Sequence, residues 1–258
     1  MSENILRLEN IQKNFEIGGK QIEVLHDINI SIERGEIISL IGSSGCGKST
    51  ILKLIINLED QTSGNIYLDD VPINEPSEKI SMIFQEPRLF PWLSVEENIS
   101  FTLDKKYSKK EKKDIAKKHI DLVGLSGYEK AYPSQLSGGM QQRVSIARAL
   151  ATEPEVLMLD EPFGALDAFT REKLQEETLN IWKEKKNTMI LVTHDIDEAI
   201  YLSNRIFVLS PKPGVVKDII NVNLDHPRDR SSLDFLDLRR KVMLSLKDKG
   251  QDKVEYYI

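Results

Sequence analysis

The chain has 258 residues, of which 40% are apolar, enough for a sizeable core in one large α/β domain or two small ones. Its 41 acidic and 35 basic residues give a net charge of −6, which argues against general nucleic-acid binding but leaves room for a local basic patch. No segment approaches the roughly 20 apolar residues of a membrane span, and Met1–Asn10 lacks the pattern of a signal peptide. The single cysteine excludes an intrachain disulfide and a multi-cysteine zinc site. We therefore expect a cytoplasmic protein.

The N-terminal region alternates between apolar and polar side chains in three short runs, at residues 5–11, 21–25 and 28–32. Such alternation is typical of half-buried strands, so the runs predict an antiparallel sheet beside the rest of the domain. Phe15 falls on the expected loop between the first two runs. Two interpretations of its ring stay open, namely stacking on an adenine base and packing in the core.

The central motif lies at residues 42–50 and fits G-x-x-x-x-G-K-[ST] without a mismatch. It stands between an apolar run at 37–41 and a helically spaced run at 50–55, the strand, loop and helix context that this motif requires. Glycines let the backbone turn tightly around an anion, so that N–H groups and a helix N-terminus point at phosphate oxygens. Lys48 is then expected to reach the β- and γ-phosphates of a nucleotide, and Ser49 to coordinate Mg²⁺. The predicted phosphate-binding residues are Gly42, Ser43, Ser44, Gly45, Cys46, Gly47, Lys48, Ser49 and Thr50.

A second feature follows the apolar run at 80–84, which predicts a buried strand closed by Gln85. Two prolines preclude a regular helix in Glu86–Leu93, yet the segment contains four large apolar side chains. Exposed, these side chains would mark a partner surface. The alternative is that they cover a local core.

Residues 94–150 have helical character. Ser94 and Glu97 fit a capping box at a helix start, and the lysine-rich segment 105–118 predicts a solvated helix. We interpret His119 as a surface or helix-face residue because it has no metal-ligand neighbour.

A Ser-Gly-Gly element within residues 136–143 opens a further helix. The free N–H groups at such a helix start form a second anion-binding site. A single chain with two phosphate-binding helix N-termini is unusual, so this element needs an explanation beyond the first loop.

Acidic side chains end the next buried strand, where the apolar run 156–159 is followed by Asp160 and Glu161. With a phosphate-binding loop in the same chain, we expect Asp160 to help hold Mg²⁺ and Glu161 to polarise a water molecule. The alternative is an ordinary turn. His194 follows the apolar run 188–193, and parallel sheets bind ligands at the edge where their strands end. We therefore expect it beside the two carboxylates.

Taken in order, these motifs resemble the ATP-binding subunit of ABC transporters over about residues 5–216. The most specific part is LSGGMQQR at 136–143, which is similar to the signature of that family. The resemblance implies an α/β phosphate-loop NTPase fold with a mainly parallel sheet, an N-terminal antiparallel β subdomain and a helical subdomain at about 86–150. It places these in a single ATP-binding domain, residues 1–224, followed by a C-terminal helical tail, residues 225–258.

The resemblance also implies roles for individual residues, with ATP and Mg²⁺ as cofactors. Phe15 would stack on adenine, Glu161 would be the catalytic base, and each ATP would lie between the loop of one copy and the signature of a second copy. The implied catalytic residues are Gln85, Glu161 and His194; the metal-binding residues are Ser49, Gln85 and Asp160; the nucleotide-binding residues beyond the loop are Phe15, Ser137, Gly138, Gly139 and Asp167.

A finer resemblance, to import ATPases for nitrate, sulfonates and taurine, rests on Gln85–Trp92, Phe163–Arg171 and His226–Arg230. It implies a peripheral subunit on the cytoplasmic face of the membrane, with a permease docked near Gln85–Leu93 and a solute-binding protein on the other side. No nucleic acid is expected. The alternatives are a soluble ABC ATPase acting on nucleic acid or ribosomes, and the ATPase of an exporter.

Overall fold

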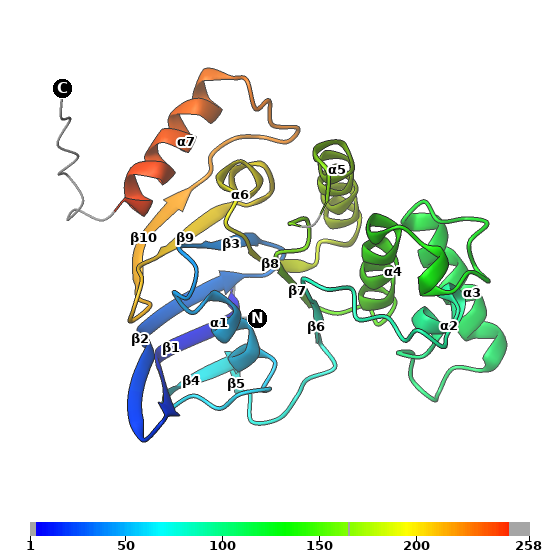
Figure 1. Cartoon of the computed structure of the whole chain (residues 1–258), viewed down its shortest axis with the longest axis horizontal. Coiled ribbons are helices and arrows are strands. Elements are labelled where there is room, and N and C mark those ends of the chain that lie inside the picture. Colours follow the sequence, from blue (N-terminus) through cyan, green and yellow to red (C-terminus); the bar gives the residue numbers. More distant parts are fainter. Residues whose placement is uncertain (1–3, 165, 248–258) are drawn as a thin grey trace.

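A six-stranded sheet forms the centre of the computed structural model, which describes residues 4–164 and 166–247 (Figure 1). Its strands are β3 (Ile37–Ile41), β6 (Ile80–Ile83), β7 (Val156–Asp160), β8 (Thr188–Val192), β9 (Arg205–Leu209) and β10 (Val216–Asn221). Their order is β10-β9-β3-β8-β7-β6. Within this sheet β10 pairs antiparallel with β9, and the other neighbouring pairs are parallel. The mainly parallel sheet predicted from the sequence is confirmed.

A smaller antiparallel sheet lies beside it, in the order β2-β1-β4-β5. Its strands are β1 (Asn4–Ile17), β2 (Lys20–Glu33), β4 (Ser63–Leu68) and β5 (Val71–Pro72). The second and third predicted runs prove to be one long strand, because pairing with β1 continues on both sides of a register shift between Leu25 and Ile28, where Asp27 has a φ of 46°. Phe15 therefore lies in β1 opposite Ile22, and the prediction of a loop there was wrong. The turn is confined to Gly18 and Gly19, both at positive φ.

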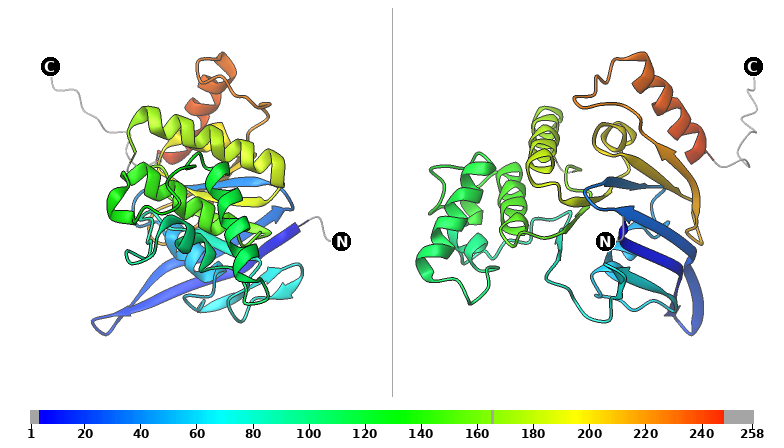
Figure 2. Two further views of the ribbon diagram at one scale, coloured as in Figure 1. Left: turned by 90° about the vertical axis from the view of Figure 1, so that its right-hand side faces the viewer. Right: turned by 180° about the vertical axis from the view of Figure 1, so that it is seen from behind.

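The described part of the chain also contains seven α-helices and a 3-10 helix, η1 (Pro133–Gln135). Figure 2 shows that α2, α3 and α4 project together to one side of the sheets. The helices are α1 (Lys48–Ile55), α2 (Val95–Ser100), α3 (Lys109–Leu122), α4 (Gly138–Leu150), α5 (Ala168–Lys185), α6 (Ile196–Leu202) and α7 (Leu233–Leu246). The lysine-rich helix starts later than expected, because Ser108 and Glu111 form a capping box there. His119 is buried on its inner face, where Nδ1 contacts the Ile115 carbonyl at 2.9 Å.

Alternation along the central strands supplies side chains to two cores. Ile38 and Leu40 pack with α1 and the antiparallel sheet, whereas Leu157 and Leu159 pack with the helical subdomain and α5. Helix α1 is thus enclosed between the two sheets. The loop before it is held by β3 at one end and by this core at the other.

The strand register brings the ends of four parallel strands to one edge of the sheet. Val192 in β8 pairs with both Leu40 in β3 and Asp160 in β7, and Ile83 in β6 pairs with Leu159. The loops that leave these ends contain most of the site residues expected from the sequence. The topology therefore fixes where a site can form.

The C-terminal segment packs against the domain more closely than its polar composition indicated. Helix α7 lies against β9, β10 and α6 (Figure 1), with Phe235 and Val242 buried. Arg228 is only 5% exposed, and its guanidinium donates hydrogen bonds to the carbonyls of Ile200 and Ser203 at the end of α6. These carbonyls belong to the group that a helix end leaves without intrahelical partners.

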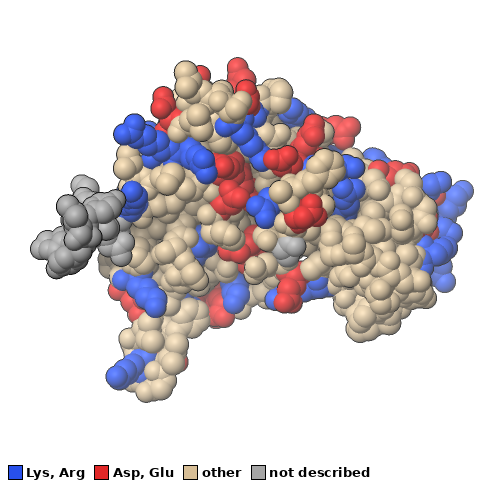
Figure 3. All heavy atoms as spheres, turned by 45° about the horizontal axis from the view of Figure 1, so that its top comes forward, with Lys and Arg blue, Asp and Glu red and all other residues tan. Residues whose placement is uncertain are grey.

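Surface properties agree with the overall composition. In the described ranges, no helix combines the length and apolar character needed to cross a membrane. Acidic and basic side chains are interspersed over the face shown in Figure 3, and basic side chains gather at the end formed by the helical subdomain. This face has no extended field of one sign.

Arg228→Met should destabilise the domain, because it removes a buried donor and leaves the α6 carbonyls unsatisfied. We expect a loss of about 2–3 kcal/mol in the free energy of unfolding, measured by urea denaturation. Arg239→Met is the matched control, since Arg239 forms an exposed ion pair with Asp197 at 2.9 Å. This substitution should lower the free energy of unfolding by less than about 1 kcal/mol. Equal losses for the two variants would contradict the capping role of Arg228.

Candidate functional site

The loop between β3 and α1 contains glycines at positions where a Cβ atom would clash with neighbouring atoms. Gly47 has a φ of 95°, and a Cβ there would lie 2.3 Å from Leu25 Cδ2. A Cβ on Gly42 would lie 2.6 Å from Cys46 Sγ. Helix α1 starts directly after Gly47 and has no side-chain cap in the structure as described, so its first N–H groups face the loop. The loop is therefore a concave surface lined with hydrogen-bond donors, suited to an anion.

Lys48 lies across this loop and is 7% exposed. Its Nζ donates to the carbonyls of Gly42 at 2.8 Å and Ser43 at 3.3 Å. A phosphate is a stronger acceptor for an ammonium group than a neutral carbonyl. The side chain is thus held at the loop by contacts that an incoming phosphate can replace. Cys46 is fully buried in the core behind the loop.

A cavity of about 490 Å³ opens over the loop. We call it the loop cavity; its lining residues are Phe15, Val24, Ser44, Gly45, Gly47, Lys48, Ser49, Thr50, Glu161 and His194. Phe15 is half-buried, with Lys13 Nζ 4.6 Å from its ring centroid. Val24 was not predicted, but it lies two residues after Ile22, the β2 partner of Phe15, and residues two apart share a strand face. A known strand pairing would have found it.

Asp160 and Ser49 lie together at the inner end of the site. Ser49 Oγ donates to Asp160 Oδ1 at 3.1 Å, and burial raises the pKa of Asp160 against the lowering effect of that hydrogen bond. Hydroxyl and carboxylate oxygens are hard donors of the kind that Mg²⁺ prefers. The described residues contain no group of three or more His, Cys, Asp or Glu that could hold a metal alone. These residues fit Mg²⁺, which completes its shell with water and substrate phosphates.

The three predicted catalytic residues come together around the Glu161 carboxylate. Glu161 Oε2 accepts from Gln85 Nε2 at 3.3 Å, and its Oε1 lies 3.4 Å from His194 Nδ1. Glu161 has a φ of 46°, an uncommon backbone conformation for a residue with a side chain. Its N–H donates to the Val192 carbonyl at 2.9 Å, which fixes this turn against β8. The carboxylate is held at the rim of the loop cavity by residues from two other strand ends.

Four predicted nucleotide contacts, in the signature of the helical subdomain or after β7, lie away from the loop. Ser137, Gly138, Gly139 and Asp167 do not line the loop cavity, and Figure 1 shows α4 well apart from α1. Ser137 caps α4 by accepting from the Met140 N–H at 3.3 Å, and Ser137 and Gly138 are exposed. Asp167 caps α5, and the hydrogen bond from the Thr170 N–H lowers its pKa.

A cluster of charged side chains at the start of α6, with Glu198 buried in it, was missed by the sequence analysis. Glu198 is 4% exposed, its Oε1 has no hydrogen-bond partner among the described residues, and burial together with Asp195 raises its pKa to about 8. Arg171 lies 3.4 Å from the Asp195 carboxylate and donates to the Leu166 carbonyl at 3.1 Å. Acidic residues in the first turn of a helix are commonly exposed, so the sequence did not indicate that Glu198 is buried. The available signal was its spacing of four residues from Leu202, which is buried on the same helix face.

Glu198 should make stability depend on pH. Its pKa is about 8 when folded and near its model value of 4.5 when unfolded, so between these values the folded state binds more protons. Stability should therefore fall as pH rises from about 5 to 8, by up to about 1.4 kcal/mol per pH unit. The glutamine of the Glu198→Gln variant cannot ionise. The free energy of unfolding of the variant, measured by urea denaturation, should therefore rise relative to that of the parent chain as pH increases across that range. Parallel stability curves would contradict this assignment.

Comparison with known proteins gives consistent results. The family model for ABC transporters matches residues 25–164. An aliphatic sulfonates import ATP-binding protein of Bacillus cereus is 52% identical over 243 residues, covering 94% of this chain and 96% of that protein. A nitrate import ATP-binding protein of Synechococcus elongatus is 43% identical over 232 residues, covering 88% and 85%.

Solved structures agree with the fold. A dimeric ATP-binding cassette in a post-hydrolysis state, bound to ADP and Pi, has a TM-score of 0.76 and 33% identity and covers 85% of this chain and 100% of its own. A component of an ABC transporter complex from Clostridium perfringens has the same TM-score, 30% identity, and coverage of 86% and 90%. The chain therefore belongs to the ABC transporter family, as an ATP-binding subunit that hydrolyses ATP.

Proposed function

We propose that this chain works as a symmetric pair that closes on two ATP molecules and drives the import of a small solute. The observation that supports the pair is the separation of two anion-binding helix starts, at α1 and α4, within one chain. Only the first lines the loop cavity as described. In the pair, the Ser137–Gly139 helix start of one copy covers the phosphates held in the loop cavity of the other.

Hydrolysis in this proposal depends on the residues around Glu161. The Glu161 carboxylate accepts a proton from the attacking water. Gln85 and His194 hold this carboxylate beside the γ-phosphate. Lys48 and the loop N–H groups bind the phosphates, and Phe15 stacks on adenine. Mg²⁺ neutralises developing phosphate charge when bound, and Ser49, Asp160 and Gln85 are the residues that hold it and its water ligands.

The proposed solute is a small oxyanion or related compound, in the class of sulfonates, taurine and nitrate. The relatives named above as sulfonate and nitrate import proteins support this class. The chain then acts at the cytoplasmic face of the membrane, with a permease that forms the path and an extracytoplasmic binding protein that selects the solute. The net charge of −6 gives no support to a nucleic-acid partner.

The permease is proposed to dock on an aromatic cluster in the segment after Gln85. Phe90 lies with its ring centroid 5.6 Å from that of Trp92 and 4.7 Å from that of Phe101. Trp92 is 69% exposed and Phe101 64%, so the cluster presents an apolar surface of the kind that marks partner sites.

Buried Asn98 shapes this aromatic segment. Its amide accepts from the Phe90 N–H at 2.8 Å and donates to the Phe90 and Leu93 carbonyls. The segment therefore has a fixed shape despite its lack of helix or strand. Because Gln85 precedes it directly, a shift of Gln85 on ATP binding can be passed to a docked permease.

Glu161→Gln should keep ATP binding and lose the base, reducing turnover by about 10²–10⁴-fold in a phosphate-release assay. The trapped ATP should hold the chain as a dimer in size-exclusion chromatography. Adding Ser137→Arg should abolish that dimer while each chain still binds nucleotide. Turnover at the parental rate would overturn the role of Glu161, and a Glu161→Gln chain that stays monomeric with ATP would overturn the closed pair.

Trp92→Ser should leave melting temperature and the ATPase activity of the isolated chain unchanged, because the side chain is already exposed. Loss of its burial against the permease is worth roughly 1.5–3 kcal/mol, so co-purification should weaken tenfold or more. In cells lacking the native chain, the variant should fail to restore growth on an alkanesulfonate as sole sulfur source or on nitrate as sole nitrogen source. Leu233→Ser, an exposed apolar change on α7, is the control. Normal uptake by Trp92→Ser would refute the docking site.

A further inference from the structure

Arg171 joins the first turn of α5 to the segment that contains His194. Its Nη1 lies 3.4 Å from Asp195 Oδ2, and its Nη2 donates to the Leu166 carbonyl at 3.1 Å. Its backbone N–H donates to the Asp167 carbonyl at 2.9 Å, so the residue is fixed within the helix. A planar guanidinium that contacts two acceptors sets their relative positions. The segment after β8 is therefore held at a defined place relative to α5.

The Asp195 carboxylate uses its two oxygens for different contacts. Oδ1 accepts from the N–H groups of Asp197 and Glu198 at 2.9 and 3.1 Å and so caps α6, whereas Oδ2 faces Arg171. The Asp195 N–H donates to Thr193 Oγ1 at 3.0 Å. This one residue is thus tied to the start of α6, to α5 and to the end of β8.

His194 lies between two residues whose backbone is fixed. Its side chain is 67% exposed, so packing does not hold the imidazole ring, yet Nδ1 lies 3.4 Å from Glu161 Oε1. On one side, Thr193 is buried and its N–H donates to the Leu40 carbonyl at 3.3 Å. On the other side, Asp195 is held by the contacts described above. The position of the imidazole beside Glu161 therefore depends on both neighbours of His194.

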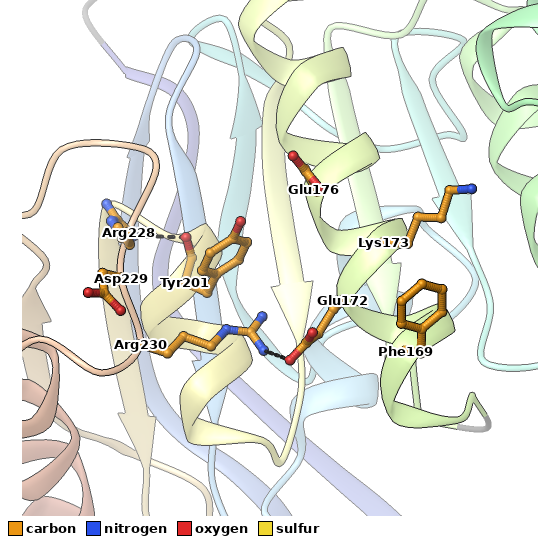
Figure 4. A pocket seen from close by; sticks show the side chains of 8 residues that line it. All are labelled: Phe169, Glu172, Lys173, Glu176, Tyr201, Arg228, Asp229 and Arg230. Atoms are coloured by element: carbon orange, nitrogen blue, oxygen red, sulfur yellow. Dashed lines mark hydrogen bonds and ion pairs between the residues drawn. The ribbon is translucent and has the colours of Figure 1, made fainter.

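Contacts other than Arg171 hold α5 against α6. Figure 4 shows Arg230 between the two helices, with an ion pair to Glu172 of α5 at 3.1 Å and its guanidinium 4.4 Å from the ring centroid of Tyr201 in α6. The pair between Arg171 and Asp195 is partly exposed, and pairs of this kind contribute little to stability. Loss of Arg171 should therefore leave the fold intact and change the local position of Asp195.

We propose that Arg171 is a positioning residue that supports ATP hydrolysis through His194. Its contact with Asp195 fixes the backbone after His194 and so keeps the imidazole beside the Glu161 carboxylate. Arg171 does not itself line the loop cavity as described. A misplacement of about 1 Å caused by a remote change can cost about 10²-fold in rate, so such a contact can govern turnover. The inference rests on the proposed function, in which His194 holds Glu161 beside the γ-phosphate.

Steady-state ATP hydrolysis by the whole chain tests this role. Arg171→Met should lower kcat roughly tenfold or more and leave KM for ATP within about twofold, because the residues that bind ATP keep their places. Arg171→Lys keeps a cation beside Asp195 and should be faster than Arg171→Met. Arg230→Met is the matched control, since it removes the neighbouring ion pair with α5 and should keep the parental kcat. Equal losses of kcat in Arg171→Met and Arg230→Met would assign the effect to helix packing and overturn the proposal.

A double-mutant cycle shows whether Arg171 acts through His194. If it does, Arg171→Met should change the residual turnover of the His194→Ala chain by less than about twofold, measured in single-turnover assays. Asp195→Asn keeps an acceptor oxygen for the α6 cap and should repeat both results, so it replaces Arg171→Met if that chain does not fold. Equal fold losses from Arg171→Met in the parent and in the His194→Ala chain would show that Arg171 acts elsewhere, against the proposal.

The same measurements separate this inference from the proposed function. Parental kcat in Arg171→Met, together with slow turnover by His194→Ala, would overturn the role of Arg171 alone. Parental turnover by His194→Ala is a different result, which overturns the proposed role of His194 and this inference with it.

Discussion

The enclosure of α1 between two sheets is the constraint on which the site depends. Gly47, at the start of α1, has room for a hydrogen atom only, because Leu25 of the antiparallel sheet presses on it. Gly214, which pairs with Leu25, approaches the same loop so closely that a Cβ there would lie 2.1 Å from the Cys46 carbonyl oxygen. The loop is therefore clamped by β2 and by the turn before β10, segments remote in sequence. Packing within the chain therefore sets the loop conformation that suits an anion, and such preorganisation lowers the ordering cost of binding.

Charged groups inside this domain are stabilised by neutral dipoles as well as by opposite charges. Lys48 is held by two backbone carbonyls, and Arg228 by the carbonyls at the end of α6. Asp160 is half-buried and accepts a hydrogen bond from the Ser49 hydroxyl, and burial raises its pKa. Burial of a charge with so few partners is costly. In the proposed function, phosphate at Lys48 and a cation at Asp160 offset this cost, whereas at Arg228 the carbonyl contacts are structural.

The sequence predicted the parts of this protein that depend on local patterns. The loop at 42–50, the strand ends at Asp160 and His194 and the Ser137 helix start are each set by neighbouring residues, and the structure has each element where it was expected. Continuity of β2 through Asp27, the burial of Glu198 and the capping role of Arg228 depend on contacts between distant segments. Periodicity contains no information on such contacts. Val24 was missed for the same reason, because its place beside Phe15 depends on the pairing of β1 with β2.

The contact of Gly139 with Leu166 and Thr170 has a thermodynamic consequence. Within one chain, it joins the helix start that would cover the partner's ATP to the turn that begins at Glu161, beside the chain's own ATP. In the proposed pair, a displacement at either end would move both, so the two bound nucleotides would share a coupling free energy. Coupling of this kind is reciprocal: each ATP changes the affinity for the other by the same factor. In the proposed pair, the affinity for the second ATP then depends on whether the first is bound.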